Sequence, residues 1–186
     1  SLGAQHLPVY ALPRMDTFLR NNGPWSQLVS LGNIDLRPAA PDLPISPSPR
    51  LQVTPLLVPH RDEFSETVAW QVKGPEKTLL YLPDIDKWDR WERDIRALIR
   101  TVDYAFLDAT FFDGDELPNR DMAEIPHPFV VESLALFEGL PAEERAKIIF
   151  THFNHSNPLL QAGSAARVRV EAAGMHVAAE GMVLGL

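Results

Sequence analysis

The chain has 186 residues, of which 17 are basic and 25 acidic, giving a net charge of -8. This length and a hydrophobic fraction of 45% predict one globular domain with its own core. No apolar run approaches the roughly 20 residues that a membrane-spanning helix needs. No basic run offers a nucleic-acid footprint, so neither a membrane nor nucleic acid is an expected partner. The N-terminus shows no signal-peptide pattern, so a cytoplasmic location is expected.

The chain contains no cysteine, so it has neither disulfides nor thiolate metal ligands. Any metal ion must therefore be held by His, Asp or Glu side chains.

The first half of the chain predicts short strands and loops. The stretch from Leu7 to Ala11 predicts a strand, and Pro13 stands where a short helix can begin. Five prolines between residues 32 and 50 exclude a long helix or a central strand, so an extended connection is expected, with a short edge strand at Ile34 to Leu36. Hydrophobic patterning predicts three further strands, at Leu51 to Val58, Glu66 to Val72 and Leu79 to Leu82.

The second half alternates between strand and helix patterns. Helical spacing of apolar residues predicts one helix from Trp88 to Val102, with Asp86 as its N-cap. Two further helices are expected, one opened by Pro128 and ended by Gly139, the other from Ser164 to Gly174. The strands predicted between and after these helices are Tyr104 to Leu107, Ile148 to Phe150, His176 to Ala178 and Met182 to Leu184. The alternation predicts an α/β fold with a mainly parallel sheet and crossover helices.

Side chains of the metal-binding type follow several of these strands. Asp84, Asp108 and His152 come directly after three successive strands, and His60 follows an earlier one. If the three strands are parallel neighbours, these side chains converge at one edge of the sheet. A mixed set of imidazoles and carboxylates suits zinc, iron or manganese. Each residue taken alone is also explained as a cap or a hydrogen-bonded polar group, and the pattern leaves both interpretations open.

Five segments of the sequence, in chain order, resemble a known family. They are LQVTPLLVPHRDEFSETVAWQV, LLYLPDID, YAFLDATFF, EIPHP and IIFTHFNHSNP. They are similar to the later half of the metallo-β-lactamase superfamily, and within it to the branch of coenzyme PQQ biosynthesis protein B and its relatives. The Z-type tRNA 3′-processing endonucleases show the same order more distantly. The resemblance implies one domain over residues 1–186, the C-terminal part of a four-layer αββα fold.

The resemblance also assigns roles to residues. It implies metal ligands at His60, Asp84 and His152, with Asp84 able to bridge two ions. It implies that Asp108 and His127 form an acid/base couple, in which His127 donates a proton or contacts a phosphate. His155 is a candidate for supporting a ligand or touching the substrate, and for His127 and His155 plain polar packing is the alternative. Zinc is the expected metal, with iron or manganese as alternatives, and a small molecule is the expected substrate.

One feature of the superfamily is missing. The defining HxHxDH motif, which lies upstream of the segment matching LPVYALP in relatives, is absent from the chain. The chain is therefore expected to be the later part of a longer protein, and the apolar face left without its partner predicts aggregation or a homodimer. Three functions stay open. The first is a hydrolase whose metal-bound hydroxide attacks an ester, amide or phosphodiester. The others are an iron-dependent, oxidoreductase-like role in PQQ-type cofactor biosynthesis and a truncated module without catalysis.

Overall fold

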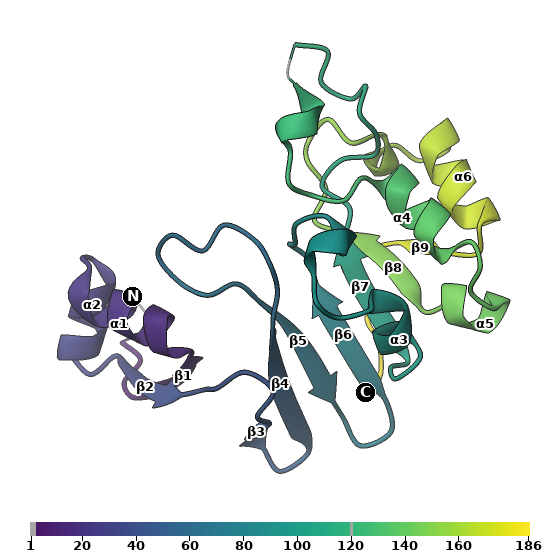
Figure 1. Ribbon diagram of the computed structural model, residues 1–186. Coiled ribbons are helices and arrows are strands. Elements are labelled where there is room, and N and C mark those ends of the chain that lie inside the picture. Colours follow the sequence, from purple (N-terminus) through teal and green to yellow (C-terminus); the bar gives the residue numbers. More distant parts are fainter. Residues whose placement is uncertain (1–2, 120) are drawn as a thin grey trace.

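A seven-stranded mixed sheet forms the body of the protein (Figure 1). The computed structural model describes residues 3–119 and 121–186. The strands, in sheet order, are β3 (Ile45–Ser48), β4 (Leu51–Leu57), β5 (Val68–Lys73), β6 (Thr78–Leu82), β7 (Tyr104–Asp108), β8 (Ile148–Thr151) and β9 (His176–Val177). Strands β3 to β6 pair antiparallel, whereas β6 to β9 pair parallel. The predicted α/β class and the mainly parallel second half are confirmed.

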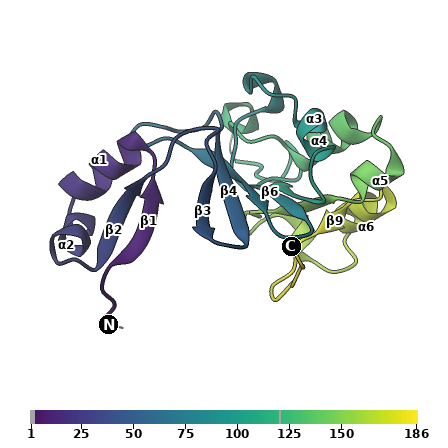
Figure 2. The ribbon, with the colours of Figure 1, turned by 90° about the horizontal axis from the view of Figure 1, so that it is seen from below.

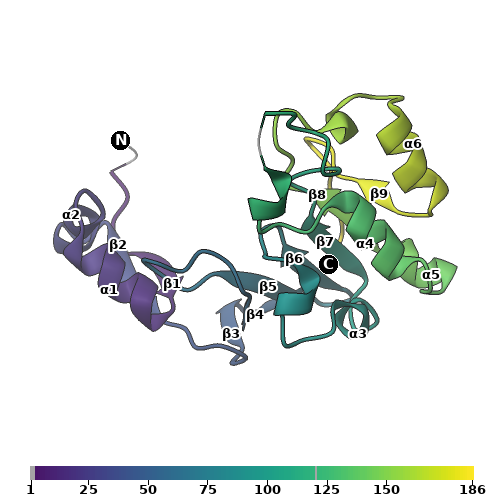
Figure 3. The same cartoon turned by 45° about the horizontal axis from the view of Figure 1, so that its top comes forward.

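Helices cover one face of the parallel half of the sheet (Figure 3). They are α3 (Ile95–Ile99), α4 (Val130–Phe137), α5 (Ala142–Arg145) and α6 (Ala165–Ala172), and three 3-10 turns accompany them, η1 (Trp88–Arg90), η2 (Met122–Glu124) and η3 (Pro158–Leu160). Alternate strand residues such as Leu80, Leu107 and Phe150 pack with Phe137 and Val170 of the helices in one buried core. As predicted, Ser164 caps α6, because its side chain accepts a hydrogen bond from a backbone N–H in the first turn.

The opposite face of the sheet is apolar and partly open. Trp70, Tyr81 and Phe106 are neighbours in register across β5, β6 and β7. The rings of Tyr81 and Phe106 lie 6.4 Å apart, and Tyr81 remains 42% exposed. An exposed apolar face was expected here. The homodimer expected from it stays a prediction.

The N-terminal residues form a small lobe beside the main sheet (Figure 2). It comprises β1 (Leu7–Ala11), α1 (Pro13–Asn21), α2 (Trp25–Ser30) and β2 (Ile34–Pro38), with β1 and β2 paired parallel. The Glu66 carboxylate holds this lobe to the loop between β4 and β5, because it accepts hydrogen bonds from the backbone N–H groups of Arg14 and Met15 in the first turn of α1. The strand expected from Ile34 exists, but it belongs to this separate sheet.

The prediction of one helix from Trp88 to Val102 is wrong. The chain forms η1, then an extended residue, Trp91, and then the short helix α3. The Trp91 indole N–H donates to the carbonyl of Leu57 at 2.8 Å, which holds this residue against β4. Asp94, not Asp86, caps α3, because its side chain accepts from the N–H of Arg96. The apolar spacing suggested one helix because these residues face the same core whether or not the helix is continuous.

The strand predicted at Met182 to Leu184 is also absent from the described part of the chain, where these residues have no regular structure. Within the same residues, no helix combines the length and apolar character needed to cross a membrane.

Arg145 provides a test of how the helical layer is held together. Its guanidinium donates to the carbonyls of Glu138 and Leu140 after α4 and to that of Ala173 after α6. Arg145→Met should lower the free energy of unfolding by about 2–3 kcal/mol, because charge-assisted hydrogen bonds to partly buried carbonyls are lost. Urea denaturation measures this.

The matched control for Arg145 is Arg167→Met. Arg167 pairs with Glu171 one turn along α6, so its replacement should change stability by no more than about 0.5 kcal/mol. Equal effects of the two substitutions would contradict the role given to Arg145.

Candidate metal centre

The parallel register brings the ends of β6, β7 and β8 to one edge of the sheet. Leu82 is opposite Leu107, and Asp108 is opposite Thr151. Consequently Asp84, Asp108 and His152 follow adjacent strand ends, as the sequence predicts.

All predicted site residues except His155 gather at this edge in two groups. One contains His60, Asp84 and His127; the other contains Asp84, Asp108 and His152. In each group the candidate ligand atoms lie within 4.8 Å of one another. Asp84 belongs to both, so the predicted ligands His60 and His152 are divided between two groups that share one carboxylate. His155 is exposed and is in neither group.

Asp86 holds the His60 ring through Nδ1, the ring nitrogen that does not face Asp84. The Nδ1 atom of His60 lies 3.1 Å from Asp86 Oδ1, and the other Asp86 oxygen accepts from Arg90 at 3.1 Å. Only the Nδ1 contact has hydrogen-bond geometry, whereas Asp84 Oδ1, at 3.1 Å from Nε2, accepts no hydrogen bond. The hydrogen of the neutral His60 ring is therefore placed on Nδ1, which leaves the lone pair on Nε2. Metal-binding histidines are commonly oriented by such a carboxylate.

Asp84 carries an unusual oxygen. Its Oδ1 atom is buried and accepts no hydrogen bond within the described structure, although His60 Nε2 and His127 Nδ1 lie 3.1 and 3.4 Å away. A buried oxygen without a partner calls for a physical cause, such as a cation. Two ligands of one tetrahedral zinc ion, each bound at about 2.0 Å, are separated by about 3.3 Å. The observed spacing of Asp84 and His60 therefore fits two ligands of the same ion.

Asp108 differs from Asp84, because the hydrogen-bonding capacity of its carboxylate is fully used. The side chain is fully buried. Its Oδ1 accepts from the backbone N–H and the hydroxyl of Thr110 at 2.8 and 2.7 Å. Its Oδ2 accepts from Ile85 N–H at 3.1 Å and from His127 Nδ1 at 2.8 Å. Four donors occupy the lone pairs of a carboxylate. Asp108 therefore belongs to the second group by position, but it has no oxygen to spare for a metal ion.

His127 is oriented by this carboxylate. Its Nδ1–H donates to Asp108 Oδ2, which leaves Nε2 available for proton transfer. Burial of the ring acts to lower the pKa of His127, but the hydrogen bond to Asp108 and the surrounding carboxylate charges outweigh it. The pKa of His127 therefore lies above its ordinary value, which favours the protonated form.

His152 comes directly after β8 and has a left-handed backbone, with φ of 64°. Its Nδ1 atom lies 3.0 Å from the hydroxyl of Thr110. The backbone N–H of Asn154 and the side chain of Asn157 donate to carbonyls of residues 110 and 109, which holds the loop after β8 against the loop after β7.

Sequence reasoning missed two residues of this site. Asp86 was predicted to cap a helix, although its position two residues after Asp84 could have suggested a supporting carboxylate. Thr110 is not singled out by the strand and histidine patterns of the sequence. Its position two residues after Asp108 is typical of a side chain that closes a local hydrogen-bonded turn, and this was the available signal.

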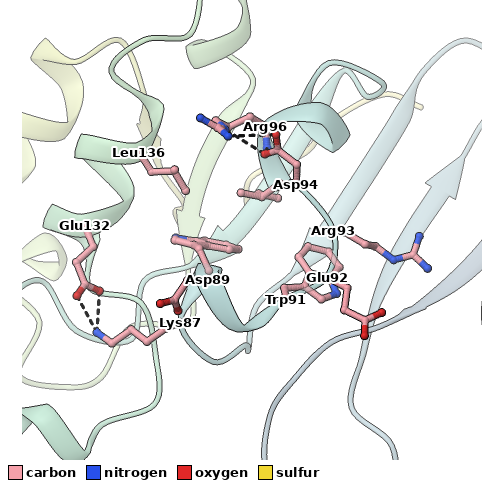
Figure 4. Close-up of a pocket in the computed structure, with 11 residues that line it drawn as sticks. Lys87, Asp89, Trp91, Glu92, Arg93, Asp94, Arg96, Glu132 and Leu136 are labelled. Carbon is pink, nitrogen blue, oxygen red and sulfur yellow. Dashed lines mark hydrogen bonds and ion pairs between the residues drawn. The ribbon is translucent and has the colours of Figure 1, made fainter.

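A pocket of about 760 Å³ lies away from this cluster, between η1, α3 and α4 (Figure 4). Four of its charged side chains form ion pairs within the pocket: Lys87 pairs with Glu132 at 2.7 Å and Arg96 with Asp94 at 3.0 Å. None of the predicted site residues lines it. The groups of metal-ligand type therefore lie at the sheet edge and not in this pocket.

Comparison with known proteins gives the class. The family model of the beta-lactamase superfamily domain matches residues 2–153, and the chain therefore belongs to the metallo-β-lactamase superfamily. Within it, the chain is similar to coenzyme PQQ synthesis protein B of Methylobacterium radiotolerans, with 30% identity over 173 residues, or 83% of this chain and 57% of that protein. The family and the branch predicted from the sequence are confirmed.

Solved structures confirm the fold. The Zn²⁺-bound PqqB from Methylobacterium extorquens has a TM-score of 0.80 and 23% identity, covering 98% of this chain and 66% of that one. A diphosphatase from the PhnP family has a TM-score of 0.57 and 17% identity, covering 100% of this chain and 60% of that one. This chain spans 57% of the length of coenzyme PQQ synthesis protein B of Methylobacterium radiotolerans. The two residue groups at the sheet edge provide side chains of the type that could hold a divalent metal.

Asp86 can be tested separately from the ligands. Asp86→Ala should weaken the affinity for Zn²⁺ by about 10–100-fold, because His60 loses the partner that fixes its ring and tautomer. Competition with a chromophoric chelator measures the affinity. The exposed neighbour Asp89 serves as the control, and Asp89→Ala should leave the affinity unchanged. An unaltered affinity in Asp86→Ala would show that His60 is not held as described.

Proposed function

We propose that the protein is a metal-dependent hydrolase that binds divalent metal, zinc in the first place, through the shared carboxylate of Asp84, with His60 as a ligand in one group and His152 in the other. Its substrate is a small molecule with an ester, amide or phosphodiester bond. The observation that supports this most strongly is the buried, unpaired Oδ1 of Asp84, whose side chain belongs to both groups of ligand-type residues. A carboxylate with this position suits bridging between two ions.

A bound metal ion and the side chains of the protein contribute different parts of the reaction. A bound divalent ion supplies a Lewis acid and a water molecule acidified enough to react near neutral pH. His127 holds a proton on Nε2 and delivers it to the leaving group, and its raised pKa keeps that proton available. Asp108 holds the His127 ring in place and stabilises its charged form.

The charge of the chain bears on the substrate. A net charge of -8 gives no electrostatic attraction for a polyanion. This favours a small molecule over a nucleic acid.

The central experiment removes the shared carboxylate. Asp84→Asn should lower the affinity for Zn²⁺ by more than about 100-fold. This loss exceeds the loss of about 10–100-fold that is expected when a residue that only orients a ligand is replaced. The substitution should also abolish the hydrolysis of whichever probe the wild-type protein cleaves among bis(p-nitrophenyl) phosphate, p-nitrophenyl acetate and a chromogenic lactam. Chelation should stop this hydrolysis and added zinc should restore it. The control Asp89→Asn should behave like the wild type. A zinc-loaded wild-type protein that cleaves none of the three bond types would contradict the proposal.

A second experiment tests the role of His127 as proton donor. His127→Ala should slow hydrolysis of a phenyl ester or phenyl phosphodiester by about 10²–10⁴-fold. The loss should be much smaller for the p-nitrophenyl analogue, whose leaving group needs no proton, and the affinity for zinc should not change. Equal losses for both leaving groups would rule out proton donation by His127.

A second function is favoured by the names of the relatives, which are coenzyme PQQ synthesis proteins. In this alternative the same ligands hold iron, and the protein takes an oxidoreductase-like part in the biosynthesis of a PQQ-type cofactor. Activity that requires iron and oxygen, and disappears when zinc alone is bound, would favour it. Activity retained with zinc under anaerobic conditions would exclude it.

A further inference from the structure

Thr110 lies between the candidate metal ligands and the acid/base pair. Its Oγ1 atom is 2.7 Å from Asp108 Oδ1, 3.0 Å from His152 Nδ1 and 3.3 Å from His127 Nδ1. The Thr110 backbone N–H donates to the same Asp108 oxygen at 2.8 Å. One hydroxyl group thus contacts three of the side chains at the site.

The number of hydrogens at these atoms determines the direction of each bond. A threonine hydroxyl donates one hydrogen and accepts through its lone pairs. Asp108 receives hydrogen bonds from four donors and has no position left for a proton, so it accepts the Thr110 hydrogen. The Thr110 oxygen can then only accept from His152. The hydrogen of the neutral His152 ring must therefore be on Nδ1, and the lone pair is on Nε2.

His152 needs such a partner more than His60 does. It is exposed, whereas His60 is half-buried. An exposed imidazole without a fixed hydrogen bond can rotate and exchange tautomers, and only the nitrogen without hydrogen binds a metal ion. The Asn154 N–H donates to the Thr110 carbonyl at 2.9 Å, so the main chain keeps the His152 loop beside the hydroxyl. Thr110 thus accepts a hydrogen bond from Nδ1 of His152, as Asp86 does from Nδ1 of His60.

We propose that Thr110 is a positioning residue that fixes His152 as its Nδ1-protonated tautomer and turns Nε2 toward the metal site. Through the shared oxygen it also joins this ligand to Asp108, which orients His127. The tautomer follows from the hydrogen bonds alone, whereas its purpose in metal binding rests on the proposed function.

The experiment begins with the metal-free protein. Long-range ¹H–¹⁵N spectra at about pH 8, above the ordinary pKa of histidine, report which ring nitrogen carries the hydrogen, and His152→Gln assigns the signals. The wild type should show His152 protonated on Nδ1. Thr110→Ser keeps the hydroxyl and should give the same tautomer, whereas Thr110→Val keeps the shape and should give a mixture or the other tautomer. Unchanged His60 signals and an unchanged melting temperature serve as controls for folding.

Zinc affinity is measured on the same three proteins by chelator competition. Thr110→Val should bind Zn²⁺ about 10–100-fold more weakly, while Thr110→Ser should stay within about 3-fold of the wild type. Cobalt substitution adds a spectroscopic readout, since a displaced His152 should alter the visible bands in Thr110→Val but not in Thr110→Ser.

The outcomes separate the two proposals. A wild-type His152 protonated on Nε2 would overturn the role of Thr110 without any variant, even if Thr110→Val failed to fold. An unchanged tautomer and affinity in Thr110→Val would also overturn it, while leaving the hydrolase proposal intact. The expected tautomers together with no zinc binding by the wild type would support the role of Thr110 and count against the proposed function.

Discussion

The fully buried carboxylate of Asp108 accepts four hydrogen bonds, from the segments that follow β6 and β7 and from His127. A buried charge is stable only when such partners compensate for its lost hydration. The bond from Ile85 N–H fixes the turn that carries Asp84, and the bond from His127 fixes its ring. The contact with Thr110 extends the network to His152. The geometry of the site therefore depends on one side chain whose hydrogen-bonding capacity is fully used.

This saturation gives the two aspartates different roles. Asp84 and Asp108 follow neighbouring strands, and both lie near histidine nitrogens. Asp84 keeps a buried oxygen without a hydrogen-bond partner, whereas Asp108 has none to spare. Proximity alone would make both candidate ligands. The hydrogen-bond count instead favours Asp84 as the candidate ligand and leaves Asp108 as the partner of His127.

Much of the fold was predictable because strand patterns are local. The strands that carry the site, β4 and β6 to β8, begin and end within two residues of their predicted positions. Parallel pairing then follows from the strand–helix alternation, and with it the convergence of Asp84, Asp108 and His152. The split of the region from Trp88 to Val102 was not predictable in this way, because it depends on a hydrogen bond between Trp91 and β4, far away in sequence.

The supporting residues were harder to find for the same reason. Asp86 and His60 are 26 residues apart, and Thr110 and His152 are 42 apart. Their pairing appears only once the sheet has formed. His155 follows the same strand as His152, only three residues later in the sequence. It is nevertheless exposed and outside both groups, because it lies in the turn beyond the strand end.

The proposed chemistry depends on a metal ion bound by the unpaired oxygen of Asp84. Anomalous diffraction at the zinc absorption edge, on crystals grown with zinc, tests it most directly. We expect an anomalous peak whose coordinating atoms include Asp84 Oδ1 and His60 Nε2. Zinc found only at other residues, with Asp84 Oδ1 still unpaired at saturating zinc, would contradict it.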